Sequence, residues 1–168
     1  TEYYKNPDLT AEVFTKDGFF HTGDKAIWDE SLNAFTITGR VKDIFKSSKG
    51  KYITPVPIES TLAANSHVEQ VCVMGAGLPA PIAVVVLTDT AGALDKGDIR
   101  RSFQATLEQV NTTVESHEKL SNIVIANEGW TTENGLLTPT LKVKRDKLEE
   151  KYNSVIAQSF SEAIHWES

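Results

Sequence analysis

Two groups of basic residues are the first candidates for chemistry in this chain. The first group consists of Arg40, Lys42, Lys46, Lys49 and Lys51, and the second consists of Lys142, Lys144, Arg145, Lys147 and Lys151. Clustered cations on an acidic chain are able to bind a localised anion such as a phosphate ester. The alternative is that both groups are solvated surface, and charge alone does not decide between the two.

A carboxylate in the segment Thr22-Gly23-Asp24 is the third candidate. The two oxygens of Asp24 can accept from two hydroxyl donors, and such charge-assisted hydrogen bonds are stronger than neutral ones. In isolation, a Thr-Gly-Asp segment more often forms a turn that the Asp side chain caps. The four His residues are scattered and have no ligand partner at metal-binding spacing, so we expect no metal site in this chain.

The composition of the 168 residues is that of a globular protein, with 40% hydrophobic and 24% charged residues. The net charge of −6 argues against non-specific binding to nucleic acid. Cys72 is the only cysteine, which favours a reducing compartment such as the cytoplasm. No apolar run approaches the roughly 20 residues of a membrane-spanning helix.

Residues 1–39 predict short elements without a core of their own. We expect a helical turn over 10–14, followed by a hairpin whose strands are 26–28 and 34–38. Asn33 suits a left-handed position in the hairpin turn. This segment therefore reads as the edge of a larger structure.

The pattern after Arg40 predicts a complete small domain. A hairpin is expected from 43–45 and 51–54, and β-branched apolar runs predict three buried strands at 68–74, 82–87 and 122–126. Helices are expected over 58–64, over 98–114 and through 148–160. The predicted fold class is α/β (α+β): a small mixed three-stranded sheet with a β-hairpin and packed helices, preceded by a β-rich tail.

Three segments together carry a family resemblance. They are 20–24 (FHTGD), 39–46 (GRVKDIFK, continuing to Ile53) and 137–145 (LTPTLKVKR). In order and separation they resemble the C-terminal part of the adenylate-forming enzymes, most closely the long-chain fatty acid CoA ligases. The resemblance covers almost the whole chain and is most specific over 3–60 and 136–147. Two alternatives stay open: an adenylating domain of another type, peptide-synthetase or luciferase-like, and a non-catalytic interaction module with the same fold.

The resemblance implies a division into two domains. Residues 1–41 would be the tail of a large N-terminal AMP-binding domain, Lys42 with Asp43 the hinge, and 43–168 the lid domain. Such enzymes join a fatty acid to ATP, release diphosphate, and pass the acyl group from AMP to CoA. In the family most of the ATP, Mg²⁺ and acyl sites precede the segment corresponding to Thr1, so we expect the isolated chain to be inactive. We also expect it to self-associate, and the full enzyme to be cytoplasmic with peripheral membrane contact.

The resemblance also implies roles in nucleotide and CoA binding. Asp24 would accept the ribose hydroxyls of ATP, with Thr22 and Arg40 beside it, although Arg40 could instead form an interdomain salt bridge. Lys49 and Gly50 would line the path of the CoA pantetheine. Lys49 departs from the Gly-Gly that the family often has there, so the resemblance does not imply that this loop is as tight as in the family.

Two lysines would be catalytic by the same resemblance, Lys142 in adenylation and Lys46 in the loop that faces the active site after domain rotation. During adenylation a carboxylate must approach an α-phosphate, and both are anions. An ammonium that contacts both converts repulsion to attraction, worth about 4 kcal/mol at 4 Å and an effective dielectric constant near 20. The proline in Thr138-Pro139 holds the preceding residue extended and stiffens the approach to Lys142.

Overall fold

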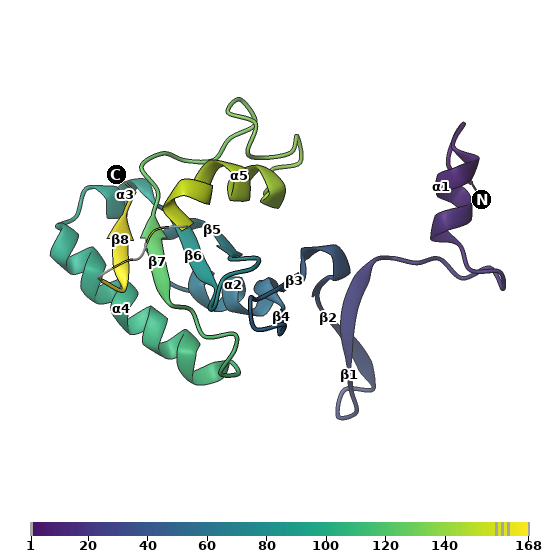
Figure 1. The fold of residues 1–168 in the computed structure, drawn as a ribbon, viewed down its shortest axis with the longest axis horizontal. Helices are drawn as coiled ribbons and strands as arrows, with labels where there is room; N and C mark the ends of the chain where they lie inside the picture. Colours follow the sequence, from purple (N-terminus) through teal and green to yellow (C-terminus); the bar gives the residue numbers. More distant parts are fainter. Residues whose placement is uncertain (1, 157, 159, 161, 168) are drawn as a thin grey trace. The chain divides into compact units, whose positions relative to one another are not determined.

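The chain forms two compact units, Thr1–Lys42 and Asp43–Ser168, in a computed structural model that describes residues 2–156, 158, 160 and 162–167 (Figure 1). Each unit is described by itself. We refer to them as the N-terminal unit and the C-terminal unit.

The N-terminal unit contains one helix and one hairpin. Its elements are α1 (Pro7–Val13), β1 (Asp24–Asp29) and β2 (Ala34–Arg40). Helix α1 begins earlier than predicted, because Pro7 occupies its first turn and the Asn6 side chain accepts a hydrogen bond from the Leu9 amide. The predicted antiparallel hairpin is confirmed, and Asn33 in its turn has a φ of 50°.

No residue in 2–38 is buried. Large apolar side chains on the hairpin are open to solvent, including Leu32 and Phe35, each 70% exposed, and Ile37 at 66%. A two-stranded ribbon of this kind is marginal by itself in water. The N-terminal unit thus has the expected lack of a core.

The C-terminal unit is built on a mixed four-stranded sheet. Its strands are β5 (Val68–Met74), β6 (Ile82–Leu87), β7 (Asn122–Ile125) and β8 (Ile164–Trp166), in the order β5-β6-β7-β8. β5 and β6 are antiparallel, whereas β6, β7 and β8 run parallel. The three predicted strands are confirmed, but the predicted strand number was wrong. Strand β8 has only three residues, too few to show an alternating pattern, and it pairs with a strand about 40 residues earlier in the sequence.

The remaining elements of the C-terminal unit surround this sheet. They are β3 (Phe45–Lys46), β4 (Tyr52–Ile53), α2 (Pro55–Ala63), α3 (Asp89–Gly92), α4 (Lys96–Thr113) and α5 (Arg145–Ile156). The short helix η1 (Val41–Asp43) spans the boundary between the two units. Strands β3 and β4 form the predicted hairpin. Helix α5 ends at Ile156, so the predicted extension to Phe160 was wrong.

Apolar side chains cover both faces of the sheet. On one face α2 packs beside α4, which buries the apolar stripe of Ile99, Phe103, Leu107 and Val110. On the other face α5 packs with Trp130, Leu136 and Leu137. Figure 1 shows α4 and α5 on opposite sides of the strands. The loops of this unit carry the candidate residues Lys49, Gly50 and Lys142.

Candidate functional site

The structure brings Thr22, Asp24 and Arg40 together in the N-terminal unit. Asp24 and Arg40 are paired across β1 and β2, and Arg40 Nε lies 3.3 Å from Asp24 Oδ1. The Asp24 amide donates to Thr22 Oγ1 at 3.1 Å. Both charged side chains are partly exposed, Asp24 at 27% and Arg40 at 52%. Arg40 thus forms an ion pair within its own unit, and the pair presents a carboxylate beside a guanidinium.

Lys142 lies on a tight turn between Leu137 and Val143, which pair as an isolated antiparallel bridge. The Thr138 amide donates to the Lys142 carbonyl at 2.8 Å, and the Lys142 amide donates to Thr138 Oγ1 at 3.0 Å. Leu141 adopts a left-handed conformation with a φ of 59°. The backbone of the turn is therefore fixed, while the Lys142 side chain is exposed.

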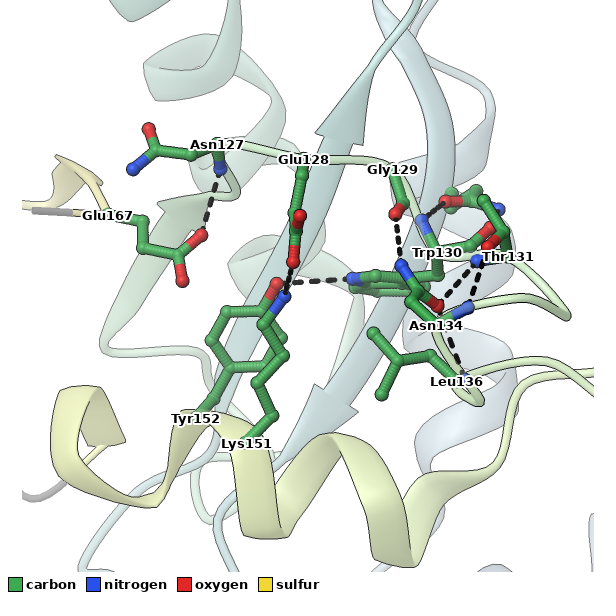
Figure 2. A network of polar contacts seen from close by, with 11 residues as sticks. Asn127, Glu128, Gly129, Trp130, Thr131, Asn134, Leu136, Lys151, Tyr152 and Glu167 are labelled. Carbon is green, nitrogen blue, oxygen red and sulfur yellow. Dashed lines mark hydrogen bonds and ion pairs between the residues drawn. The ribbon is translucent and has the colours of Figure 1, made fainter.

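A network of polar contacts fixes the segment that leads into this turn (Figure 2). The buried indole of Trp130 donates from Nε1 to the hydroxyl of Tyr152, on α5, at 3.2 Å. The amide side chain of Asn134 accepts from the Thr131 and Leu136 backbone amides and donates to the Gly129 carbonyl. Side-chain packing and hydrogen bonds thus hold the segment that precedes the Lys142 turn.

Lys46 lies on β3, at the start of a turn that contains Gly50. The Lys46 ammonium is 5.5 Å from the ring centre of Tyr52, within cation–π range. The turn closes with a hydrogen bond from the Gly50 amide to the Ser47 carbonyl at 2.9 Å. Gly50 takes the left-handed position, with a φ of 78°. Lys49 lies at an exposed position without positive φ, so the turn does not need a glycine there.

The same turn is bonded to the loop between β5 and β6. The Lys46 carbonyl accepts from the Gly77 amide at 2.8 Å, and the Ser48 amide donates to the Leu78 carbonyl at 2.9 Å. Lys46, on β3, and Lys142, in the turn between Leu137 and Val143, occupy separate segments of the C-terminal unit. Among the described residues, no hydrogen bond or ion pair joins their side chains.

Lys42 and Asp43 lie in the short helix η1, and the boundary between the two units falls between them. Asp43 Oδ2 lies 3.9 Å from Arg145 Nε. The hinge role of Lys42 and Asp43 stays a prediction, because it concerns a rotation between units.

Arg145 is the residue whose importance the sequence did not show. Its Nη2 donates to Glu59 Oε2 at 2.7 Å and its Nη1 donates to the Val73 carbonyl at 3.0 Å. Burial acts to lower the pKa of the Arg145 guanidinium, but the hydrogen bond and charge of Glu59 and the charge of Asp43 outweigh it and raise that pKa above its ordinary value. The only sequence signals were its place in the second basic group and at the end of the segment 137–145.

Cys72 lies beside Arg145 and is predicted to be unreactive in the native protein. Arg145 Nη1 contacts Cys72 Sγ at 3.2 Å, and burial raises the pKa of the thiol to about 12. Because the thiolate is the nucleophile, we expect native labelling by iodoacetamide at pH 8 to be at least about 1,000-fold slower than for an exposed cysteine. Mass spectrometry of the peptide containing Cys72 measures this rate. Labelling should become fast in urea, and fast labelling without urea would contradict the packing.

Residues 2–156, 158, 160 and 162–167 contain neither a metal-binding cluster nor a membrane-spanning helix. No three His, Cys, Asp or Glu side chains gather there in a metal-binding arrangement. No helix among them is both long and apolar enough to cross a bilayer.

The fold of the C-terminal unit, a mixed four-stranded sheet with α2 and α4 on one face and α5 on the other, is that of the small C-terminal domain of adenylate-forming enzymes. The chain belongs to the family described as the AMP-binding enzyme C-terminal domain, which matches residues 42–163.

Curated relatives and solved structures support the same family. The chain is 32% identical to fatty acyl-CoA synthetase A of Dictyostelium discoideum, over 95% of the chain and 27% of the relative. It is 35% identical to long-chain-fatty-acid–CoA ligase 5 of Mus musculus, over 96% of the chain and 26% of the relative. The adenylation domain of a carboxylate reductase from Mycobacterium chelonae is similar with a TM-score of 0.77 and 30% identity, over 92% of this chain and 25% of that one. The chain thus spans about a quarter of the length of these proteins.

Proposed function

We propose that this chain is the C-terminal part of an ATP-dependent long-chain fatty acid CoA ligase. The enzyme would convert a fatty acid, ATP and CoA to acyl-CoA, AMP and diphosphate, in two half-reactions. The relatives named as acyl-CoA synthetases and ligases support this assignment. The observation that carries it is the exposed Lys142 on a hydrogen-bonded turn, in a chain that also presents the Asp24–Arg40 pair.

Lys142 would act in the first half-reaction. Its ammonium would contact both the fatty acid carboxylate and the α-phosphate of ATP, and so reduce their mutual repulsion. Negative charge concentrates on the same phosphate oxygens in the transition state, so the stabilisation is greater there than in the ground state. A compact ammonium on a flexible stem suits delivery from a surface turn.

The N-terminal unit would bind the nucleotide. Asp24 would accept from the ribose hydroxyls, and the Arg40 guanidinium, 3.3 Å away, would hold the carboxylate in its orientation. Thr22 would fix the local backbone through its hydrogen bond with the Asp24 amide.

The turn around Gly50 would serve the second half-reaction. After rotation about Lys42 and Asp43, Lys46 and Lys49 would line the path by which pantetheine reaches the acyl-adenylate. The hydrogen bonds from this turn to Gly77 and Leu78 support a fixed wall for such a path. The domain boundaries, 1–41 and 43–168, are part of this proposal.

The proposal also concerns the large N-terminal domain of the enzyme and the location of the enzyme. A large N-terminal domain would cover the exposed apolar ribbon of β1 and β2 and would bind most of the ATP and Mg²⁺. Without that domain we expect the chain to be inactive and to self-associate through the ribbon. A cytoplasmic location with peripheral membrane contact belongs to the same proposal.

An assay of the full-length parent enzyme tests the proposed activity. Diphosphate release would be measured with a graded series of fatty acids, with CoA present or omitted, and acyl-CoA would be measured in parallel. We expect long-chain acids to give acyl-CoA only when both ATP and CoA are present. Adenylation without any transfer to CoA would contradict the assignment.

A second candidate is an adenylating enzyme of another type, with a peptide-synthetase or luciferase-like second step. The structural similarity to the carboxylate reductase adenylation domain, at 30% identity, favours keeping it. The same assay separates the two, because this candidate forms acyl-adenylate but no acyl-CoA.

A further inference from the structure

Arg145 begins α5 directly after the turn that carries Lys142. Its side chain is only 18% exposed, and it contacts three separate parts of the C-terminal unit. Nη2 bonds to Glu59 on α2, Nη1 bonds to the Val73 carbonyl on β5, and Nε lies 3.9 Å from Asp43 next to the unit boundary. One part-buried cation therefore joins a helix, the sheet and the first residue of the unit.

Glu59 makes this junction more rigid. Its Oε1 accepts from the Val73 amide at 2.7 Å while its Oε2 accepts from Arg145. Both partners of the ion pair are thus bonded to the backbone of the same residue of β5. Removing one partner of a part-buried pair leaves the other charge uncompensated, so the arrangement depends on both.

The backbone between Lys142 and Arg145 transmits this rigidity to the turn. The Lys144 amide donates to the Leu136 carbonyl at 2.9 Å, and the Lys142 carbonyl accepts from the Thr138 amide at 2.8 Å. Only two residues separate Lys142 from Arg145, and both strands of the turn are bonded to each other. The position of Arg145 therefore determines the position of the Lys142 backbone.

We infer that Arg145 is a positioning residue for Lys142, which fixes the lysine turn and Asp43 to one support so that they move as one body. This inference rests on the proposed function, since it concerns adenylation by Lys142. Only a planar, forked guanidinium reaches Glu59, the Val73 carbonyl and Asp43 together. A lysine at position 145 keeps the charge but cannot make all three contacts.

The test compares Arg145→Lys with wild type in the full-length parent enzyme. We expect kcat for adenylation to fall about 10- to 100-fold, because a misplacement of about 1 Å can cost that much, while KM for ATP changes less than about twofold. Thioester formation from supplied acyl-adenylate should stay within about threefold of wild type. Glu59→Gln, which keeps the size of the side chain, should show the same split and carries the test if Arg145→Lys does not fold.

The matched control is Lys151→Gln on the same helix. Lys151 also forms an ion pair, with Glu128 at 2.5 Å, but it lies away from the turn. We expect both half-reactions to be unchanged in this variant. The inference is overturned if Arg145→Lys has wild-type adenylation. It is also overturned if this variant lowers the rates of both half-reactions and the melting temperature alike. The proposed function fails separately, if Lys142→Ala retains adenylation in an otherwise wild-type enzyme.

Discussion

Replacing Lys142 with alanine is expected to reduce adenylation by about 1,000-fold in the full-length parent enzyme. An ammonium placed 4 Å from an anion at an effective dielectric constant near 20 contributes about 4 kcal/mol, and each 1.36 kcal/mol corresponds to about tenfold in rate. The second half-reaction does not bring two anions together at this site. Thioester formation from supplied acyl-adenylate should therefore stay within about threefold. Diphosphate release and acyl-CoA formation measure the two steps separately.

Lys147→Ala is the control for this variant. Lys147 belongs to the same basic cluster, but its ammonium is paired with Glu150 on the solvent side of α5. Its loss removes the same charge at a similar place in the chain, so adenylation should be nearly unchanged. If Lys142→Ala lowers both half-reactions equally, or if Lys147→Ala is as damaging, the role assigned to Lys142 is wrong.

The sheet and the long helix could be predicted because their signals are local. Strands β5, β6 and β7 are β-branched apolar runs, and the apolar stripe of α4 repeats with a helical period. Strand β8 could not be predicted, because three residues carry no period and its formation depends on pairing with the distant β7. The end of α5 was overestimated for a related reason: Phe160 continues the apolar stripe but packs against the core from outside the helix.

In the candidate site, too, the features that depend on neighbouring residues could be predicted from the sequence, and those that depend on distant residues could not. The turn around Gly50 and the Thr138-Pro139 approach to Lys142 follow from residue types at short spacing. The left-handed φ of Leu141 does not, since a non-glycine residue takes that conformation only where surrounding contacts hold it. The contacts of Arg145 lie 72 to 86 residues away in sequence at Val73 and Glu59, so only the folded chain shows them.

Replacing Asp24 with alanine is the second variant with a large expected effect. Two hydrogen bonds from ribose hydroxyls to a carboxylate contribute about 1.5–3 kcal/mol each. Their loss should lower kcat/KM for ATP by roughly 100- to 10,000-fold, since about 1.4 kcal/mol is tenfold. The loss should appear mainly in KM if the bonds are equally strong in the ground and transition states. Initial rates of diphosphate release at varied ATP concentration measure both constants.

Asp29→Ala is the matched control, because Asp24 is the first residue of β1 and Asp29 is the last. Its carboxylate caps the hairpin turn by accepting from the Ser31 hydroxyl and from the amides of Ser31 and Leu32. The variant therefore weakens the hairpin without removing the proposed ribose ligand. If Asp24→Ala and Asp29→Ala raise KM for ATP equally, the effect comes from the fold of the hairpin. If only Asp24→Ala raises KM for ATP, Asp24 contacts the nucleotide directly. Without such a contact, the remaining charge of Arg40 would favour the phosphates of ATP, and the variant would lower KM.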